Sequence, residues 1–361
     1  MLNDCLEELQ KFLKGEFKKL DVVVMPDFFL DRLVTLAWDV GCFSENLQNV
    51  VKKKGGSIDE VRQVELGGGN AINTASALVA LDVNVTPIVC TNYLGLQLIR
   101  FYLNSKKIDF SHVKIFDKAS ITTAIEFEIE KTKVNVMLRD LGALANFGPQ
   151  WLDENDYESI ENADYVCVFN WAGTKRFGTK LTKAVFSHLK TKGKGKSYLD
   201  TADPSPNRGK IPELLKNVLQ ARHVDILSVN ENEAISYASQ LSSEIEEAKR
   251  RLRFGELAKE SARILASRLR ARIDLHTTSF SSTFTRKDET IVPAFKIPIL
   301  RVTGAGDAWN AGNILGDACK LSDDCRLTLA NLVAAYYISN PKGMHPTKGQ
   351  LVRFCEKLRQ K

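Results

Sequence analysis

Short apolar runs alternate with amphipathic stretches through the middle of the chain. The apolar runs predict five buried strands, at Asp21–Met25, Val85–Cys90, Tyr165–Phe169, Ser197–Leu199 and Ile226–Val229. The amphipathic stretches between them predict helices, for example over Ala71–Leu81, Lys180–Lys190 and Pro212–Ala221. Strands that alternate with helices are typical of a mostly parallel sheet covered on both faces, so the pattern predicts an α/β fold.

One segment follows a different pattern. Ile121–Leu138 alternates apolar and polar residues with period two, on both sides of a turn at Lys131–Lys133. This alternation predicts a hairpin with one apolar and one polar face. Together with strands from Asp31–Val40 and Val61–Leu66, the hairpin is expected to form a small sheet that projects from the main domain.

Two further segments are amphipathic and charged. Residues 1–20 predict a short helix and contain no apolar core of the kind found in a signal peptide. Ser243–Arg272 predicts a charged helical region with a break at Gly255. We interpret its basic run, Lys249–Arg253, as a solvated helix face rather than a nucleic-acid contact.

Composition narrows the class of protein. A chain of 361 residues with 44% hydrophobic and 26% charged residues is neither disordered, collagen-like nor a small disulfide-rich protein. The net charge of +6 comes from mixed charges and does not indicate a nucleic-acid partner. There is no apolar run long enough to predict a membrane span. Seven scattered cysteines without a C-x-x-C pair predict reduced thiols and a cytoplasmic location.

The segment from Arg301 to Asn313 carries the strongest chemical signal. Three very small residues precede Asp307, and a helical pattern follows at once. Small residues let a ligand approach the backbone amides at a helix N-terminus, where anions bind. Asp307 is then either a helix-terminal acid favoured by the helix dipole, or a base that accepts a hydroxyl proton while the Gly304–Gly306 amides hold a phosphoryl group.

Two more segments have polar groups at the start of a predicted helix. Gly67–Ala75 is rich in glycine but is not a G-x-G-x-x-G dinucleotide motif, so it is either a tight turn or a place of close approach to a polar ligand. Asn230 and Glu233 follow a predicted strand. They either cap the helix or orient water around Mg²⁺. The five histidines show no metal-binding spacing, so a zinc site is not expected.

Taken together and in this order, the three segments resemble the ribokinase-like (PfkB) carbohydrate kinase family over about Asp21–Met344. The resemblance implies a doubly wound, mostly parallel sheet with a small β-sheet lid. It also implies a helical extension at residues 1–20, a kinase domain at 21–361, and lid strands from about 31–66 and 119–139. The implied activity is ATP-dependent, Mg²⁺-assisted phosphoryl transfer to a hydroxyl of a sugar. The alternatives are a nucleoside acceptor, a non-catalytic sugar or nucleotide sensor on the same fold, or a dinucleotide-dependent oxidoreductase.

The resemblance assigns roles to individual residues. Asp307 is the implied catalytic base, and the implied anion hole is Gly304, Ala305 and Gly306. The implied acceptor-binding residues are Asp31, Gly68, Gly69 and Asn73. Nucleotide binding is assigned to Asn230, Thr303, Asn331 and His276, and a water-mediated Mg²⁺ contact to Glu233. A further family segment matches Asp200, Asp203 and Arg208.

Three positions depart from the family pattern. Arg301 stands where many members have an aspartate that helps bind an activating monovalent cation, which leaves potassium dependence open. His276–Ser281 replaces a T-x-G-x-x-G nucleotide loop, which leaves ATP or ADP open as the donor. Pro26 replaces a usual glycine near the acceptor pocket. The resemblance also suggests a homodimer formed through the lid.

Several aromatic residues lie near the predicted acceptor loops. They could stack on a nucleobase or pack in the core and the lid, and packing is the preferred interpretation for most of them. These residues are Phe28, Phe29, Trp38, Phe147 and Trp171.

Overall fold

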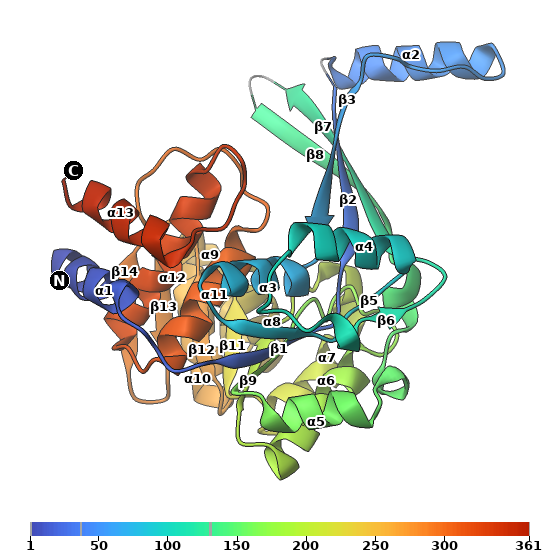
Figure 1. Ribbon diagram of the computed structural model, residues 1–361. Helices are drawn as coiled ribbons and strands as arrows, with labels where there is room; N and C mark the ends of the chain where they lie inside the picture. Colours follow the sequence, from blue (N-terminus) through green and yellow to red (C-terminus); the bar gives the residue numbers. More distant parts are fainter. Residues whose placement is uncertain (1, 37, 130–131, 361) are drawn as a thin grey trace.

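The computed structural model describes residues 2–36, 38–129 and 132–360, and its centre is an eight-stranded sheet (Figure 1). The strand order is β14-β13-β12-β11-β10-β9-β1-β4. The bounds are β1 (Asp21–Met25), β4 (Asn84–Pro87), β9 (Tyr165–Val168), β10 (Lys196–Asp200), β11 (Ile226–Val229), β12 (Arg272–His276), β13 (Phe280–Phe284) and β14 (Glu289–Pro293). Neighbours from β4 to β12 pair in parallel, whereas β13 pairs antiparallel with both β12 and β14. The predicted mostly parallel α/β sheet is confirmed.

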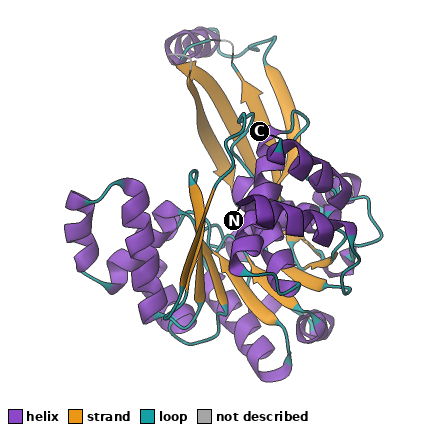
Figure 2. Ribbon diagram, turned by 90° about the vertical axis from the view of Figure 1, so that its left-hand side faces the viewer, coloured by secondary structure: helices purple, strands orange, loops and turns teal. Residues whose placement is uncertain are grey.

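Helices cover both faces of this sheet (Figure 2). Strand β1 shows why, because Val22 and Val24 belong to one apolar cluster and Val23 and Met25 to another. The first cluster includes residues of α1 (Leu2–Lys14), α3 (Asn70–Ala80), α4 (Tyr93–Tyr102), α11 (Ala305–Ala318), α12 (Asp323–Ser339) and α13 (Lys348–Arg359). The second includes residues of α5 (Glu154–Asn162), α6 (Gly178–Lys192), α7 (Ile211–Leu214), α8 (Glu231–Leu241), α9 (Glu244–Arg251) and α10 (Phe254–Arg268).

A separate four-stranded sheet, which we call the lid after its predicted role, projects from the main sheet (Figure 1). Its order is β3-β2-β7-β8, with bounds β2 (Phe29–Thr35), β3 (Arg62–Gly68), β7 (Ser120–Ile129) and β8 (Thr132–Asp140). The two central strands, β2 and β7, pair in parallel, and the outer pairs are antiparallel. Helix α2 (Val40–Lys52) joins β2 to β3 at the far end of the lid and has no buried residue. The predicted small projecting sheet is confirmed.

Several predicted boundaries are wrong. The strand expected over Asp31–Val40 ends at Thr35, and Val40 begins α2 because the Asp39 side chain caps that helix through the Cys42 amide. The turn expected at Lys131–Lys133 is shorter, since β8 begins at Thr132; residues 130 and 131 lie outside the described residues.

The other differences also have local causes. The single strand expected over Val85–Cys90 is divided. Strand β4 ends at Pro87, which cannot donate to a strand ladder, and β5 (Cys90–Thr91) pairs with β6 (Lys114–Ile115). The helical break expected at Gly255 falls just before α10, and Gly255 lies in the first turn of that helix. Thr122, on the face expected to be polar, is buried at the base of the lid, where it lies opposite Asp31 of β2.

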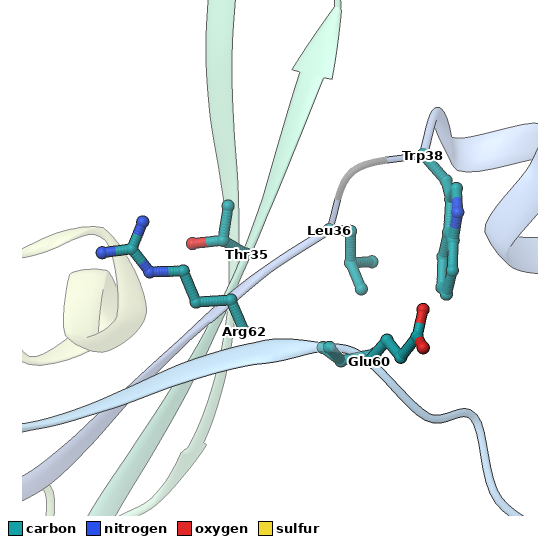
Figure 3. A pocket seen from close by; sticks show the side chains of 6 residues that line it. Thr35, Leu36, Trp38, Glu60 and Arg62 are labelled. Carbon is teal, nitrogen blue, oxygen red and sulfur yellow. The ribbon is translucent and has the colours of Figure 1, made fainter.

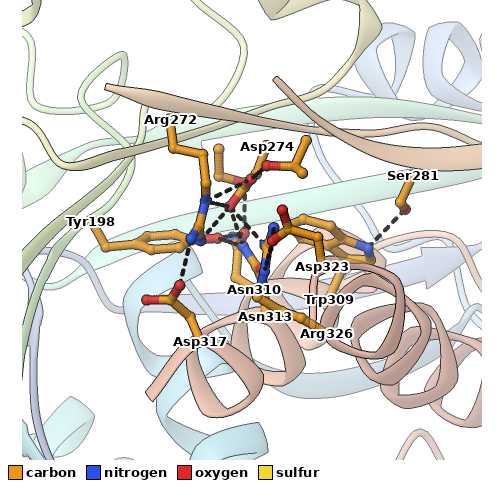
Figure 4. Close-up of polar contacts among 12 residues, drawn as sticks. Tyr198, Arg272, Asp274, Ser281, Trp309, Asn310, Asn313, Asp317, Asp323 and Arg326 are labelled. Carbon is orange, nitrogen blue, oxygen red and sulfur yellow. Dashed lines mark hydrogen bonds and ion pairs between the residues drawn. The ribbon is translucent and has the colours of Figure 1, made fainter. Parts of the chain in front are cut away.

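A buried polar network fixes helix α11 on the sheet (Figure 4). Its centre is Asp274 on β12, which accepts hydrogen bonds from Arg272, Arg326 and Asn313. Burial opposes ionisation of this carboxyl, yet the two guanidinium groups hold the pKa of Asp274 well below its usual range. The network therefore orients α11, whose N-terminus faces the end of the sheet described below.

The described residues contain no helix with both the length and the apolar character needed to cross a membrane. All seven cysteines are free thiols.

Candidate active site

Three helix N-termini meet at the carboxyl ends of the parallel strands. Gly67–Asn73 leads into α3, Asn230 begins α8, and Thr303–Asp307 leads into α11. In open parallel sheets, ligands bind at this edge because the strand ends and helix amides converge there. The three segments singled out in the sequence are thus placed at one edge of the fold.

Asp307 connects two of these segments directly. Its Oδ1 accepts a hydrogen bond from Asn70 Nδ2 at 2.8 Å, and its Oδ2 accepts one from Asn73 Nδ2 at 2.9 Å. Burial raises the pKa of Asp307 to about 8, although both asparagine donors favour the ionised form. Asp307 is therefore a carboxyl whose proton affinity is suited to exchange near neutral pH.

The backbone before Asp307 forms a tight turn. Gly304 has φ of +85°, and a Cβ at this position would be 2.7 Å from the Tyr337 hydroxyl. Only glycine fits both the conformation and the space. The Ala305 amide donates to the Val302 carbonyl oxygen at 3.2 Å. The Gly306 and Asp307 amides follow at the start of α11, where backbone amides lack an acceptor one turn earlier and can bind an anion.

Replacing Gly304 with alanine is expected to lower the free energy of unfolding by about 1–3 kcal/mol, because an alanine is strained at this φ. Urea unfolding followed by circular dichroism measures this loss. Gly209 is the matched control, since a Cβ there meets no atom within 4 Å. Equal effects of Gly304→Ala and Gly209→Ala would contradict the role given to this turn.

The predicted acceptor residues lie at the base of the lid. Asp31 on β2 and Gly68 on β3 are so close that a Cβ at Gly68 would overlap the Asp31 carboxylate. Burial raises the pKa of Asp31 to about 6, while a hydrogen bond from Thr122 and the charge of Arg139 act in the opposite direction. Asp31 Oδ1 is buried and has no hydrogen-bond partner among the described residues. Such an atom is expected to accept a donor from a ligand.

Asp27 is a site residue that the sequence analysis missed. Its carboxylate accepts hydrogen bonds from the amides of Asn70 and Ala71, each at 2.9 Å, and from Asn170 Nδ2 at 2.8 Å. It therefore caps α3, whose N-cap residue Gly69 has no side chain. Asn70 and Asn73 belong to the first turn of α3, which Asp27 caps. Asp27 therefore helps to position both asparagine side chains that donate to Asp307. An acid two residues after the first buried strand was the available signal.

Asn230 and Glu233 form a reciprocal cap at the start of α8. Asn230 Oδ1 accepts from the Glu233 amide at 3.0 Å, and Glu233 Oε2 accepts from the Asn230 amide at 3.0 Å. Burial, followed by the charge of Asp200, raises the pKa of Glu233 well above its usual range. Within the described part of the chain, no three acids, histidines or cysteines are grouped closely enough to hold a metal directly.

The residues assigned to the nucleotide lie in different environments. His276 ends β12, packs on Trp309 with ring centroids 4.9 Å apart, and lies against Gly306 of the anion loop. Its Nε2 is buried without a partner among the described residues, and burial lowers the pKa of the ring. Asn331 is bonded into the core, accepting from Trp309 Nε1 at 3.0 Å. Thr303 is exposed.

The aromatic residues named in the sequence analysis mostly pack. Phe28, Phe147 and Trp171 are fully buried, and Phe29 lies under the Arg139 guanidinium, 5.2 Å from Cζ to the ring centroid. Trp38 is different, because it lines a cavity of about 200 Å³ on the lid together with Leu36, Glu60 and Arg62 (Figure 3). This cavity lies on the lid sheet, away from Asp307.

Solved structures similar to this chain share its fold. A ribokinase from Cryptococcus neoformans var. grubii serotype A in complex with ADP is 15% identical, with a TM-score of 0.70, 94% of this chain covered and 100% of that chain. An adenosine kinase from Sinorhizobium meliloti is 16% identical, with a TM-score of 0.70 and coverage of 94% and 99%. An Arabidopsis thaliana ribokinase complexed with ribose and ATP is 16% identical, with a TM-score of 0.68 and coverage of 94% and 99%.

The sequence itself also matches a family. Comparison with curated proteins finds no match. The profile of the pfkB family carbohydrate kinases matches residues 38–267, which is more than half of the chain. That match ends before Asp307. The chain therefore belongs to the pfkB family of carbohydrate kinases and has the ribokinase-like fold.

Proposed function

We propose that this protein transfers the terminal phosphoryl group of ATP to a hydroxyl of a sugar, with a nucleoside as the alternative acceptor. The observation that carries the proposal is the buried Asp307 carboxyl, held by Asn70 and Asn73 at the N-terminus of α11. A carboxyl in this position can accept the proton of an acceptor hydroxyl while the neighbouring helix amides bind the phosphoryl group. The ribose, ATP and ADP bound to the similar ribokinases support this choice of substrates.

In the proposed reaction, the acceptor oxygen attacks the γ-phosphorus of ATP and the bond to the bridging oxygen of ADP breaks. Asp307 takes the hydroxyl proton as the new bond forms. The amides at the start of α11 and the helix dipole stabilise the charge on the phosphoryl oxygens. Asp31 holds the acceptor from the lid side, and the lid excludes water that would otherwise hydrolyse ATP.

The chain also has groups that fit a magnesium ion. Glu233, Asp200 and Asp203 place several carboxyls near the start of α8, and burial, followed by the charges of Asp200 and Asp203, raises the pKa of Glu233. A divalent cation would offset this charge, and Mg²⁺ usually keeps water between itself and such carboxylates. Glu233 is the residue that would hold the ion, through water. When bound, Mg²⁺ supplies positive charge to the donor phosphates.

We further infer that two copies associate through the lid. On β8, Val134, Val136 and Leu138 alternate onto one face and are 41%, 47% and 57% exposed. A row of exposed apolar side chains on a sheet with open edges favours burial against a second sheet. Light scattering coupled to size-exclusion chromatography is expected to give the mass of a dimer. The mass of a single chain would contradict this inference.

A coupled assay for ADP release tests the proposed reaction. ATP and Mg²⁺ are supplied with a panel of pentoses, hexoses, inositols and nucleosides, and Asp307→Asn serves as the inactive control. We expect ADP release that depends on one class of acceptor, and that class distinguishes a sugar kinase from a nucleoside kinase. No release with ATP, followed by no AMP formation with ADP as donor, would overturn the proposal and favour a non-catalytic sensor.

A further inference from the structure

The Arg301 guanidinium joins two loops beside the anion-binding turn. Arg301 lies just before that turn, and its Nη2 donates to the Asn340 carbonyl oxygen at 3.2 Å and to the Pro341 carbonyl oxygen at 3.0 Å. Both carbonyls belong to the loop that follows α12. One positive charge therefore holds the segment before α11 and the segment after α12 together.

The loop after α12 is shaped around this guanidinium. Gly343 has φ of +64°, and a Cβ at Gly343 would overlap the guanidinium. The Tyr337 ring lies beside it, with its centroid 5.8 Å from Arg301 Cζ, a distance at which a cation is attracted to the ring. His345 stacks on Tyr337, and burial followed by the charge of Arg301 lowers the pKa of His345 to about 4. His345 is therefore neutral near pH 7 and adds no second charge.

The same tyrosine connects Arg301 to the phosphate-binding turn. The Tyr337 hydroxyl is the group that lies against Gly304, which begins that turn. Burial, followed by the charge of Asp307, raises the pKa of the Tyr337 hydroxyl, and the charge of Arg301 acts in the opposite direction. Arg301 therefore contacts Tyr337, and Tyr337 contacts Gly304. The amides at the start of α11 follow Gly304 directly in the chain.

A monovalent cation does not fit this arrangement. Two carbonyl oxygens that point to one place are ordinary ligands for such an ion, but here both already accept hydrogen bonds from Arg301. An added cation would lose these oxygens and would lie next to a full positive charge, which repels it. The aspartate that many family members have at this position would attract a cation, and Arg301 has the opposite charge.

We propose that Arg301 takes the place of an activating monovalent cation, so that this protein holds its phosphate-binding turn with its own guanidinium. Arg301 is a positioning residue, since it acts through Tyr337 and the two loops. The proposal rests on the proposed kinase reaction only where turnover is measured. Nucleotide affinity and thermal unfolding test it independently.

The test compares salts at equal ionic strength. ADP affinity, measured by calorimetry with Mg²⁺, and ADP release are determined in potassium, sodium and tetramethylammonium chloride. For the unchanged protein we expect ADP affinity and the rate of ADP release to agree within about twofold in all three salts. A cation that does not bind the protein cannot change either quantity. A potassium-specific gain of about tenfold or more in affinity or turnover would overturn the proposal.

Two variants and one control make the test specific. Arg301→Ala is expected to lose about tenfold in ADP affinity or turnover, and to regain part of the loss with potassium or guanidinium ions that fill the space. Arg301→Lys keeps the charge and should stay insensitive to potassium. Arg263→Ala is the control, since the Arg263 guanidinium also donates to oxygens of other residues, two of Glu289 and one of Glu260, and also lies 5.8 Å from a ring, that of Phe284. It should change neither readout.

The outcomes separate this inference from the proposed reaction. If no acceptor is phosphorylated, the midpoint temperature of thermal unfolding still tests the role of Arg301. It should rise with potassium, relative to tetramethylammonium, for Arg301→Ala and not for the unchanged protein. An Arg301→Ala protein that behaves like the unchanged one in every salt, by affinity and by midpoint, would overturn the inference.

Discussion

Replacing Asp307 with asparagine is expected to lower turnover by about 10²- to 10⁴-fold, the usual contribution of a general base. The amide keeps the size of the carboxyl but cannot take the hydroxyl proton. Steady-state ADP release, with each substrate saturating, measures this loss. Asp288→Asn is the control, because Asp288 is exposed in the turn between β13 and β14, outside the network that orients α11. Turnover close to normal in Asp307→Asn would contradict the assignment.

The pH dependence gives a second readout for the same residue. Because the pKa of Asp307 is about 8 in the fold, kcat/KM should rise with pH until about pH 8, as the carboxyl ionises. The free energy of unfolding should instead fall as pH rises. The unfolded carboxyl titrates near 3.8, so the folded state holds a proton that the unfolded state has lost, and stability falls as pH rises from about 4 to about 8. Asp307→Asn should show a smaller decline, because Asp31 and Glu233 also have raised pKa values and keep their own contributions.

Replacing Asp31 with alanine is expected to raise the acceptor KM by about 10- to 100-fold, the range for losing hydrogen bonds to a charged group. The buried Oδ1 of Asp31 has no partner among the described residues, so a ligand hydroxyl would supply its missing donor. ADP affinity should not change, because Asp31 lies on the lid. With the pKa of Asp31 near 6, acceptor affinity in the unchanged protein should weaken below about pH 6 and lose that dependence in Asp31→Ala.

Asp140→Ala controls for removal of an acid from the lid. Asp140 ends β8, is exposed, and accepts only from the nearby Gly142 amide in the contacts described. An Asp31→Ala protein with an unchanged acceptor KM, or with an equal loss of ADP affinity, would remove Asp31 from the acceptor site.

The parts of the fold that the sequence predicts are those with a local hydrophobic signal. Strands such as Asp21–Met25 are continuous apolar runs, and they form where expected. Strand β13, Phe280–Phe284, could not be found this way, because its centre is serine and threonine. Two of these buried side chains depend on partners from other elements, since Ser281 bonds to Asn331 of α12 and Thr283 bonds to Asp274 of β12.

The same limit applies to the site. Glycine and acid patterns at helix starts indicate Asp307 and Asn73, because the chemistry of an anion site is local. The contact of Asn70 with Asp307 spans 237 positions in the chain and has no local signature. The sequence shows only that Arg301 replaces an aspartate found in many members of the family. Its two carbonyl partners follow another helix, so its role depends on tertiary structure.

The parallel pairing of β2 with β7 has a consequence for the order of folding. A parallel pair cannot close through a short turn, and the chain between Thr35 and Ser120 includes α3 and β4 of the main sheet. Bringing β2 and β7 together therefore carries the entropy of a long loop unless that intervening segment has already docked. The lid is expected to assemble after the main sheet. The helix N-termini of the proposed phosphate site would then form before Asp31 and Thr122 meet at the proposed acceptor site.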